Sequence, residues 1–186
     1  RGFAPGTWDG LRLRGHTLGV VGFGNIGRAV AQRAEAFGLR VVHHTRRSTG
    51  LPGWRPLDDL LGASDFVSLH VPLNDDSRTL LDATRLARMR PGAFLLNLAR
   101  GAVVDESALI AALQRGHLGG AALDVFADEP HVPPELLAME NVILTPHLGG
   151  GSREGRRQAQ ELCVENVLCV LRGEQPRPEC VVVAPG

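Results

Sequence analysis

The sequence has no excess of either charge and no long apolar run. Lys and Arg together number 20, and so do Asp and Glu, so no overall field favours nucleic acid or an anionic membrane. No apolar stretch is as long as a membrane-spanning helix, and the first residues lack the order of charged, apolar and small residues that marks a signal peptide. These absences predict a cytoplasmic protein that binds neither nucleic acid nor membranes.

Groups that could bind a metal or form disulfides are also scarce. The three cysteines, Cys163, Cys169 and Cys180, are an odd number without a paired C-x-x-C spacing, which predicts free thiols. No cluster of His, Cys and Asp has the spacing of metal ligands, so the sequence predicts no metal site. With 186 residues, 44% of them hydrophobic, the chain is long enough for one core and a small appended element.

Short apolar runs alternate with longer amphipathic ones from Leu18 onward. This alternation is typical of strand–helix–strand units and predicts an α/β protein with a Rossmann-type, doubly wound parallel sheet. Strands are expected at residues 18–23, 40–44, 65–70, 93–97, 120–125 and 142–144. Helices are expected at residues 26–37, 57–61, 83–89, 106–114 and 152–171.

Two of these helices carry further signals. Asp105 stands where the N-cap of the fourth helix should be, and Gly116 follows its end. The last helix has apolar or small residues at a spacing that turns one face toward a partner. These residues are Ala159, Leu162, Cys163, Asn166, Val167 and Val170.

The segment 22–27 reads Gly-Phe-Gly-Asn-Ile-Gly between an expected strand and an expected helix. Gly22 allows a tight turn, Gly24 lets a pyrophosphate approach the backbone, and Gly27 permits close packing of the helix. The free N–H groups at the start of the helix then face phosphate oxygens. An ordinary glycine turn is the alternative for such a motif alone, but the strand before it and the helix after it favour a dinucleotide site.

The end of the second expected strand has no acidic residue to bind the ribose 2′-hydroxyl of NAD. No Asp or Glu lies between Glu35 and Asp58, and the strand is followed by Thr45, Arg46 and Arg47. A hydroxyl and two guanidinium groups suit a 2′-phosphate, which an acid would repel. The sequence therefore favours NADP as the cofactor, with NAD as the alternative; the arginines could instead form a solvated basic turn.

Three runs downstream of the glycine loop supply an Arg, a Glu and a His. They are Asn-Leu-Ala-Arg-Gly at 97–101, Asp-Val-Phe-Ala-Asp-Glu-Pro at 124–130 and Thr-Pro-His-Leu-Gly-Gly at 145–150. An arginine can bind a carboxylate through two parallel hydrogen bonds, and a histidine beside a carboxylate can donate a proton to a carbonyl oxygen. With a bound nicotinamide, these groups could reduce a 2-keto acid.

With these runs and Val-Ser-Leu-His-Val-Pro-Leu at 67–73, the chain resembles the D-2-hydroxyacid dehydrogenase family from about Trp8 to Gly173. The resemblance implies that Arg100 binds the substrate carboxylate and carbonyl, that His147 donates the proton, and that Glu129 pairs with His147. A positioned general acid accelerates a reaction by roughly 100- to 10,000-fold. The alternatives are a surface arginine, a turn acid before proline and a structural histidine.

The resemblance also implies which residues contact the cofactor. Asp124 would bind the nicotinamide carboxamide, with Ala99 and Gly149 near the ring, while Asn25 and Ile26 would line the phosphates. Asp124 could instead cap a turn after its strand. The remaining expected cofactor contacts are His70, Val71, Pro72, Leu98, Arg100, His147 and Gly150.

In the resembled family a second domain folds from on the order of a hundred N-terminal residues and a returning C-terminal segment. Residues 1–15 are therefore expected to lead into a dinucleotide-binding domain at 16–148, and 149–186 to return as a helix and tail toward a substrate domain. The whole protein is expected to be a D-specific, NADPH-dependent reductase of glyoxylate, hydroxypyruvate or a related short 2-keto acid, and a homodimer. A dinucleotide-sensing interaction module and an inactive cofactor-binding fragment are the alternatives.

Overall fold

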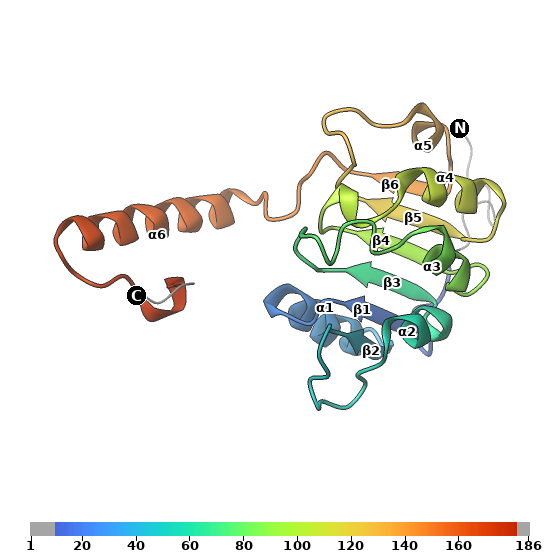
Figure 1. Ribbon diagram of the computed structural model, residues 1–186, viewed down its shortest axis with the longest axis horizontal. Helices are drawn as coiled ribbons and strands as arrows, with labels where there is room; N and C mark the ends of the chain where they lie inside the picture. Colours follow the sequence, from blue (N-terminus) through green and yellow to red (C-terminus); the bar gives the residue numbers. More distant parts are fainter. Residues whose placement is uncertain (1–9, 182–186) are drawn as a thin grey trace, which may run out of the picture. The chain divides into compact units, whose positions relative to one another are not determined.

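Six parallel strands form one sheet in the computed structural model, which describes residues 10–181 (Figure 1). They are β1 (Thr17–Val21), β2 (Arg40–His44), β3 (Phe66–Leu69), β4 (Phe94–Asn97), β5 (Gly120–Leu123) and β6 (Val142–Leu144), in the order β2-β1-β3-β4-β5-β6. This order confirms the predicted doubly wound parallel sheet. Since β2 pairs with one side of β1 and β3 with the other, the winding reverses at β1, where such sheets open a crevice.

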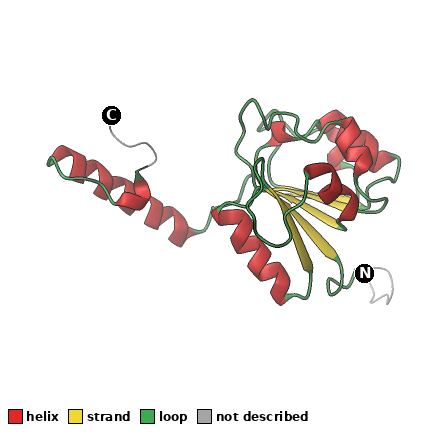
Figure 2. Cartoon of the chain, turned by 60° about the horizontal axis from the view of Figure 1, so that its bottom comes forward, coloured by secondary structure: helices red, strands yellow, loops and turns green. Residues whose placement is uncertain are grey.

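Helices cover both faces of the sheet (Figure 2). They are α1 (Asn25–Ala36), α2 (Leu57–Ala63), α3 (Ala83–Arg88), α4 (Glu106–Gln114) and the short α5 (Pro134–Leu137). Alternation along β1 separates two cores: Leu18 and Val20 face α1, whereas Val21 joins a larger cluster with α2, α3 and α4. The two-residue period of this strand therefore fixes which helix lies on which face.

Most predicted elements begin and end within two residues of the observed ones. The first strand was expected to reach Phe23 but ends at Val21, because Gly22 has a φ of +94° and turns the chain out of the sheet. The fifth strand likewise ends at Leu123 rather than at 125. Helix α5 and a 3₁₀ turn at Gly101–Val103 were not predicted, because each is too short to show a helical period.

The predicted caps of α4 are confirmed. The Asp105 carboxylate accepts a hydroxyl from Ser107 at 2.6 Å and the backbone N–H of Ala108 at 3.0 Å. These hydrogen bonds hold the pKa of Asp105 below its ordinary value. Gly116, with a φ of +69°, follows the end of the helix.

Asp65 joins three segments at the amino ends of the strands. Its carboxylate accepts the Thr17 N–H at 2.8 Å and contacts the His16 ring at 3.2 Å and the Arg90 guanidinium at 2.6 Å. Burial alone would raise the pKa of Asp65, but the Thr17 hydrogen bond, His16 and Arg90 together lower it. The ionised carboxylate therefore stabilises the folded state.

We expect Asp65→Asn to lower the free energy of unfolding by about 1–2 kcal/mol at pH 7. Because the folded pKa is depressed, this contribution is present above the unfolded pKa of about 3.9 and is lost as pH falls through the folded value. Urea unfolding at pH 7 and pH 3 measures it. Asp128→Asn is the matched control, since Asp128 also faces a histidine, His131, but both are exposed; its effect should stay within about 0.5 kcal/mol. A gap between wild type and Asp65→Asn that is as large at pH 3 as at pH 7 would contradict this account.

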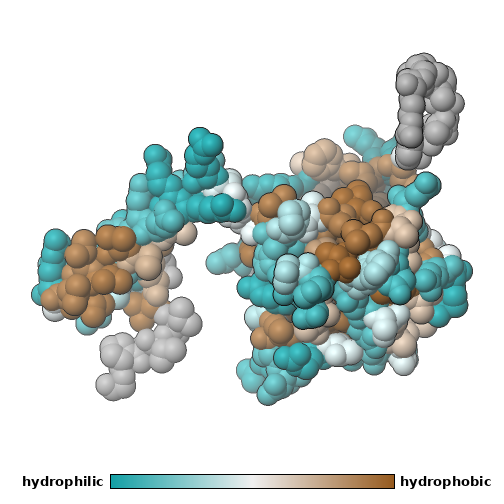
Figure 3. Space-filling model, turned by 90° about the horizontal axis from the view of Figure 1, so that it is seen from above, coloured by the Kyte–Doolittle hydropathy of each residue, from teal (hydrophilic) through white to brown (hydrophobic). Residues whose placement is uncertain are grey.

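The chain divides into two compact units, Arg1–Pro146 with the sheet and His147–Gly186. The second unit contains α6 (Arg153–Leu171), capped by Ser152, whose hydroxyl accepts the Gly155 N–H at 2.9 Å, and a 3₁₀ turn at Pro178–Cys180. The predicted bounds of this helix are confirmed, but the expected packing of one face is not, since α6 has no buried residue in the structure. The C-terminal half of α6 has exposed apolar side chains (Figure 3): Val164, Val167, Leu168, Val170 and Leu171.

The three cysteines are free thiols, as predicted. Within residues 10–181, no helix is long and apolar enough to span a membrane. The same residues contain no group of three or more His, Cys, Asp or Glu side chains that could hold a metal ion. Part of the expected lead-in segment, residues 1–9 with Trp8, lies outside the described residues.

Candidate functional site

The carboxyl ends of the first five strands collect most of the predicted site residues. Because all strands are parallel, every loop that leaves a strand starts from the same edge of the sheet. Ligands of open α/β sheets bind outside this edge, at the point where the winding reverses. The segments that leave this edge contain Gly22, Gly24 and the first turn of α1 with Asn25, Ile26 and Gly27 after β1, Thr45, Arg46 and Arg47 after β2, His70, Val71 and Pro72 after β3, Leu98, Ala99 and Arg100 after β4, and Asp124 after β5.

The glycine loop has two tightly packed glycines and one open one. A Cβ on Gly22 would lie 2.4 Å from the His70 carbonyl oxygen, and one on Gly27 would lie 2.0 Å from the Gly22 carbonyl oxygen. A Cβ on Gly24 would meet no atom within 4 Å. Gly24 is the N-cap of α1, which has no side-chain cap and no acid in its first turn. The backbone N–H groups at this end of α1 thus suit a bound anion such as a pyrophosphate.

Phe23, between the first two glycines, is held in place by contacts with His43 and Arg28. Its ring stacks on the buried His43 ring, with centroids 3.8 Å apart, and the Arg28 guanidinium lies 5.3 Å from its centre. Arg28 also donates Nε–H to the Phe23 carbonyl at 3.1 Å. Burial, and then the Arg28 charge, lower the pKa of His43. The contact between Phe23 and His43 joins segments that lie far apart in the sequence and was not predicted.

A pocket of about 440 Å³ opens between the ends of β1 and β2 and the loop after β3. Its size falls in the range of small-molecule sites. The lining residues are Val21, His44, Thr45, Arg46, Leu57, Val71, Pro72, Asn74, Asp76, Ser77, Leu80 and Arg85. The structure therefore brings the predicted residues Thr45, Arg46, Val71 and Pro72 around one cavity of mixed polarity, which fits a nucleoside and its ribose substituents.

The polar groups that follow β2 are already in contact with protein atoms. The Thr45 hydroxyl donates to the Arg47 carbonyl at 2.6 Å, and the Trp54 indole donates to the Thr45 carbonyl at 3.3 Å. Arg46 forms an ion pair with Asp76, which lies in the loop between β3 and α3. Asp76 was not predicted to lie here, because it is far from Arg46 in the sequence and reaches it only through the fold.

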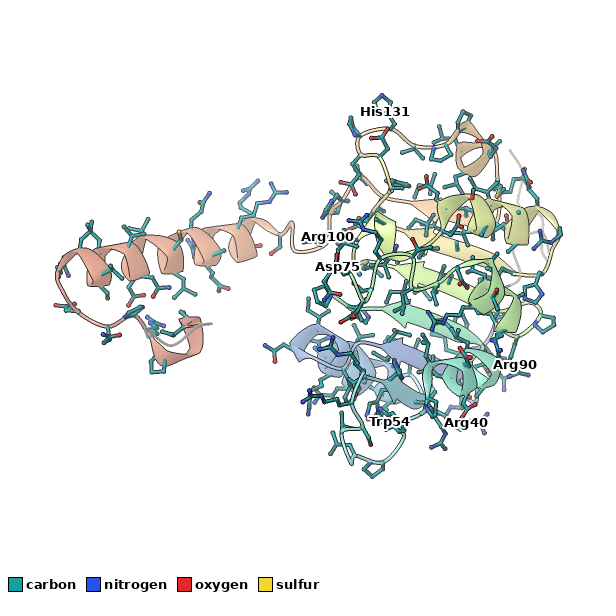
Figure 4. All side chains as sticks on the ribbon, in the orientation of Figure 1. Arg40, Trp54, Asp75, Arg90, Arg100 and His131 are labelled. Carbon is teal, nitrogen blue, oxygen red and sulfur yellow. The ribbon has the colours of Figure 1, made fainter. Side chains whose placement is uncertain are left out.

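Asn97 fixes the loop that presents Arg100. Its buried amide donates to the Arg100 carbonyl at 3.1 Å, and its Oδ1 accepts the Ala99 N–H at 3.1 Å. The Arg100 side chain itself is exposed at the carboxyl edge of the sheet (Figure 4), where its guanidinium donates to the Ala99 carbonyl at 2.6 Å. A backbone held from the end of β4 thus supports a side chain that faces outward.

The loop with Glu129 packs directly against the Arg100 loop. A Cβ on the buried Gly101 would lie 1.9 Å from the Phe126 carbonyl carbon, so the two backbones touch. The Glu129 carboxylate accepts the Phe126 N–H at 3.0 Å, and Glu106 accepts the Ala127 N–H at 3.2 Å. The peptide bond between Glu129 and Pro130 is cis. The first unit therefore brings the loops of two predicted catalytic residues together.

A known family matches most of the chain. The family described as "D-isomer specific 2-hydroxyacid dehydrogenase, NAD binding domain" matches residues 2–149. The chain belongs to this family. The resemblance stated from the sequence motifs is thereby confirmed, and the glycine loop and the pocket lie in this NAD-binding domain of the 2-hydroxyacid dehydrogenases.

Relatives in this family include reductases of known structure. The glyoxylate reductase of Pyrococcus furiosus is 44% identical over 179 residues, which cover 92% of this chain and 53% of that protein. A crystal structure from Thermus thermophilus has a TM-score of 0.90 at 49% identity, covering 95% of this chain and 57% of the other. The structure of an NADPH-dependent glyoxylate/hydroxypyruvate reductase from Sinorhizobium meliloti, in complex with NADP and malonate, has a TM-score of 0.82 at 41% identity. The match covers 86% of this chain and 51% of the other. The chain spans about half the length of the curated relatives it matches.

Asp124 and the residues from His147 onward complete the predicted set for this dehydrogenase domain. Asp124 is buried after β5, and its carboxylate accepts the Thr145 hydroxyl at 2.5 Å. His147, with a φ of +51°, begins the second unit, which also contains Gly149 and Gly150. The pairing of Glu129 with His147 and the contact of Asp124 with a nicotinamide stay predictions.

Proposed function

We propose that the complete protein is a D-specific, NADP-dependent reductase of glyoxylate, hydroxypyruvate or a related short 2-keto acid. The observation that carries the proposal is the pocket between the ends of β1 and β2. The loop after β2 contributes Arg46 to the wall of this pocket and contributes no acidic residue. A guanidinium there suits the 2′-phosphate of NADP. Relatives named glyoxylate reductase, and one named NADPH-dependent and bound to NADP, support the same choice.

Different residues of this chain bind different parts of the cofactor. The bound cofactor supplies the hydride. Gly24 leaves room for the pyrophosphate at the N-terminus of α1, and the apolar groups Val71 and Leu80 face the nucleoside from the pocket wall. Arg46 and Arg47 bind the 2′-phosphate, which is the difference between the two nicotinamide cofactors.

Three side chains act on the keto acid in this proposal. Arg100 binds its carboxylate through two parallel hydrogen bonds and orients one face of the carbonyl toward the nicotinamide. His147 donates a proton to the carbonyl oxygen, and Glu129 pairs with the imidazole for that transfer. The contact of the Gly101 and Phe126 backbones keeps the Arg100 and Glu129 loops at a fixed separation. The homodimer and the cytoplasmic location also stay predictions.

The test is an assay of the complete protein, with its N-terminal part restored, that follows NADPH or NADH absorbance against a panel of 2-keto acids. We expect consumption of NADPH with glyoxylate or hydroxypyruvate, and a kcat/KM at least about tenfold lower with NADH, because the charged contacts to the 2′-phosphate are lost. No consumption with any 2-keto acid would overturn the proposed reaction. Equal rates with both cofactors would overturn the NADP preference alone.

A further inference from the structure

The loop between β3 and α3 places a carboxylate against the arginine proposed to bind the 2′-phosphate. Asp76 and Arg46 come from different loops, line the same pocket and form an ion pair. Both side chains are more than half exposed, so the pair can open without a large loss of packing. Arg85, the other arginine on this wall, donates to the Leu80 carbonyl at 2.8 Å and faces Asp58.

The turn that presents Asp76 is held by its own hydrogen bonds. The buried Ser77 hydroxyl donates to the Pro72 carbonyl at 2.6 Å and accepts the Asn74 N–H at 2.9 Å. The Asn74 Oδ1 accepts the Ser77 N–H at 3.1 Å in return. Because the backbone on both sides of Asp76 is fixed in this way, its carboxylate stays near the pocket whether or not Arg46 is paired with it.

We propose that Asp76 determines nucleotide specificity by competing with the 2′-phosphate for Arg46. A phosphate monoester carries about −1.5 to −2 charges at pH 7, so it must draw Arg46 away from Asp76 and then lie near an unpaired carboxylate. The 2′-hydroxyl of NAD carries no charge and leaves the ion pair intact. Asp76 therefore reduces the preference for NADP that Arg46 and Arg47 would give without it. The inference rests on the proposed function.

The test measures dissociation constants of 2′,5′-ADP and 5′-AMP for the chain by calorimetry, since these two probes differ only by the 2′-phosphate. We expect Asp76→Asn to bind 2′,5′-ADP about two- to fivefold more tightly than wild type, the size of an exposed ion-pair effect, with 5′-AMP unchanged. Asp75→Asn is the matched control, because it removes the same charge from the neighbouring exposed residue, which is not part of the pocket wall. It should leave both constants within about 1.5-fold, since solvent and salt screen its charge.

The other outcomes overturn the inference. Equal effects of Asp75→Asn and Asp76→Asn on 2′,5′-ADP affinity would show a general effect of charge and no specific role for Asp76. Weaker binding of 5′-AMP by Asp76→Asn would make Asp76 a ribose ligand instead of a competitor. By contrast, the inference predicts that in an Arg46→Gln background Asp76→Asn acts no differently from Asp75→Asn, because the guanidinium for which Asp76 and the phosphate compete is absent.

The single variant Arg46→Gln separates this inference from the proposed function. If Arg46→Gln leaves 2′,5′-ADP affinity unchanged, Arg46 does not bind the 2′-phosphate, and the proposed NADP site fails together with the role of Asp76. If Arg46→Gln weakens 2′,5′-ADP binding while Asp76→Asn and Asp75→Asn behave alike, the proposed NADP site stands and only the inference fails.

Discussion

Replacing Arg100 by Gln in the complete protein is expected to lower kcat/KM for the 2-keto acid by roughly 100-fold or more. Loss of one partner from a charged, hydrogen-bonded pair costs about 3 kcal/mol, and every 1.4 kcal/mol corresponds to a factor of about ten. Within residues 10–181, the exposed guanidinium donates a hydrogen bond only to the carbonyl of the preceding residue, so the fold does not depend on its charge. Steady-state kinetics with saturating NADPH measure the loss.

Two further variants make the Arg100 result specific. Arg115→Gln removes a charge at the C-cap of α4, which precedes β5 and so lies at the opposite edge of the sheet; it should leave kcat/KM within about twofold, since salt screens a distant exposed charge. Arg100→Lys keeps the charge but not the planar pair of donors, and should recover only part of the rate. NADPH affinity should change little in all three. An unchanged rate in Arg100→Gln would refute the proposed substrate contact.

The sheet could be predicted from the sequence because its four central strands are largely buried and its strands are separated by strong turn residues. The apolar run before Gly22 and the aliphatic run of β4 show their strands directly, and Asp105 and Gly116 mark both ends of α4. The prediction was less accurate at strand ends. Phe23 continues the apolar pattern of β1, yet the positive φ of Gly22 ends the strand before it.

The site could be predicted only where its residues follow one another in the chain. The glycine loop and the Arg100 run are local motifs, so both can be recognised in the sequence. Asp76 was missed since its partner Arg46 is 30 residues away and the contact depends on the loops after β2 and β3, the two strands that flank β1 in the sheet. The Glu106 carboxylate, which accepts the Ala127 N–H from 21 residues away, was missed for the same reason. Nothing in local periodicity reports such contacts.

Gly101→Ala is expected to lower the free energy of unfolding by about 3 kcal/mol, the upper end of what an overpacked core costs. The added methyl would lie 1.9 Å from the Phe126 carbonyl carbon, 2.0 Å from its oxygen and 2.4 Å from the Ala127 nitrogen. These are backbone atoms, so no rotation of a side chain relieves the overlap, and one loop must move. Urea unfolding of the chain measures the loss of stability.

Gly62→Ala is a control with the opposite expected sign. Gly62 is exposed within α2, and the nearest atom to an added Cβ is the Arg88 carbonyl oxygen at 3.8 Å, an ordinary contact. Alanine there should raise the free energy of unfolding by about 0.5–1 kcal/mol, because it restricts the unfolded chain and favours the helix.

The same Gly101→Ala variant in the complete protein separates packing from chemistry. If the loops of Arg100 and Glu129 must stay in contact for catalysis, kcat should fall at temperatures where the variant is still folded. A variant that loses stability but keeps kcat would show that the loop contact serves the fold alone. A variant that keeps its stability would show that the Phe126 backbone can move with little loss of free energy. The claim that this contact fixes the separation of the two loops would then be wrong.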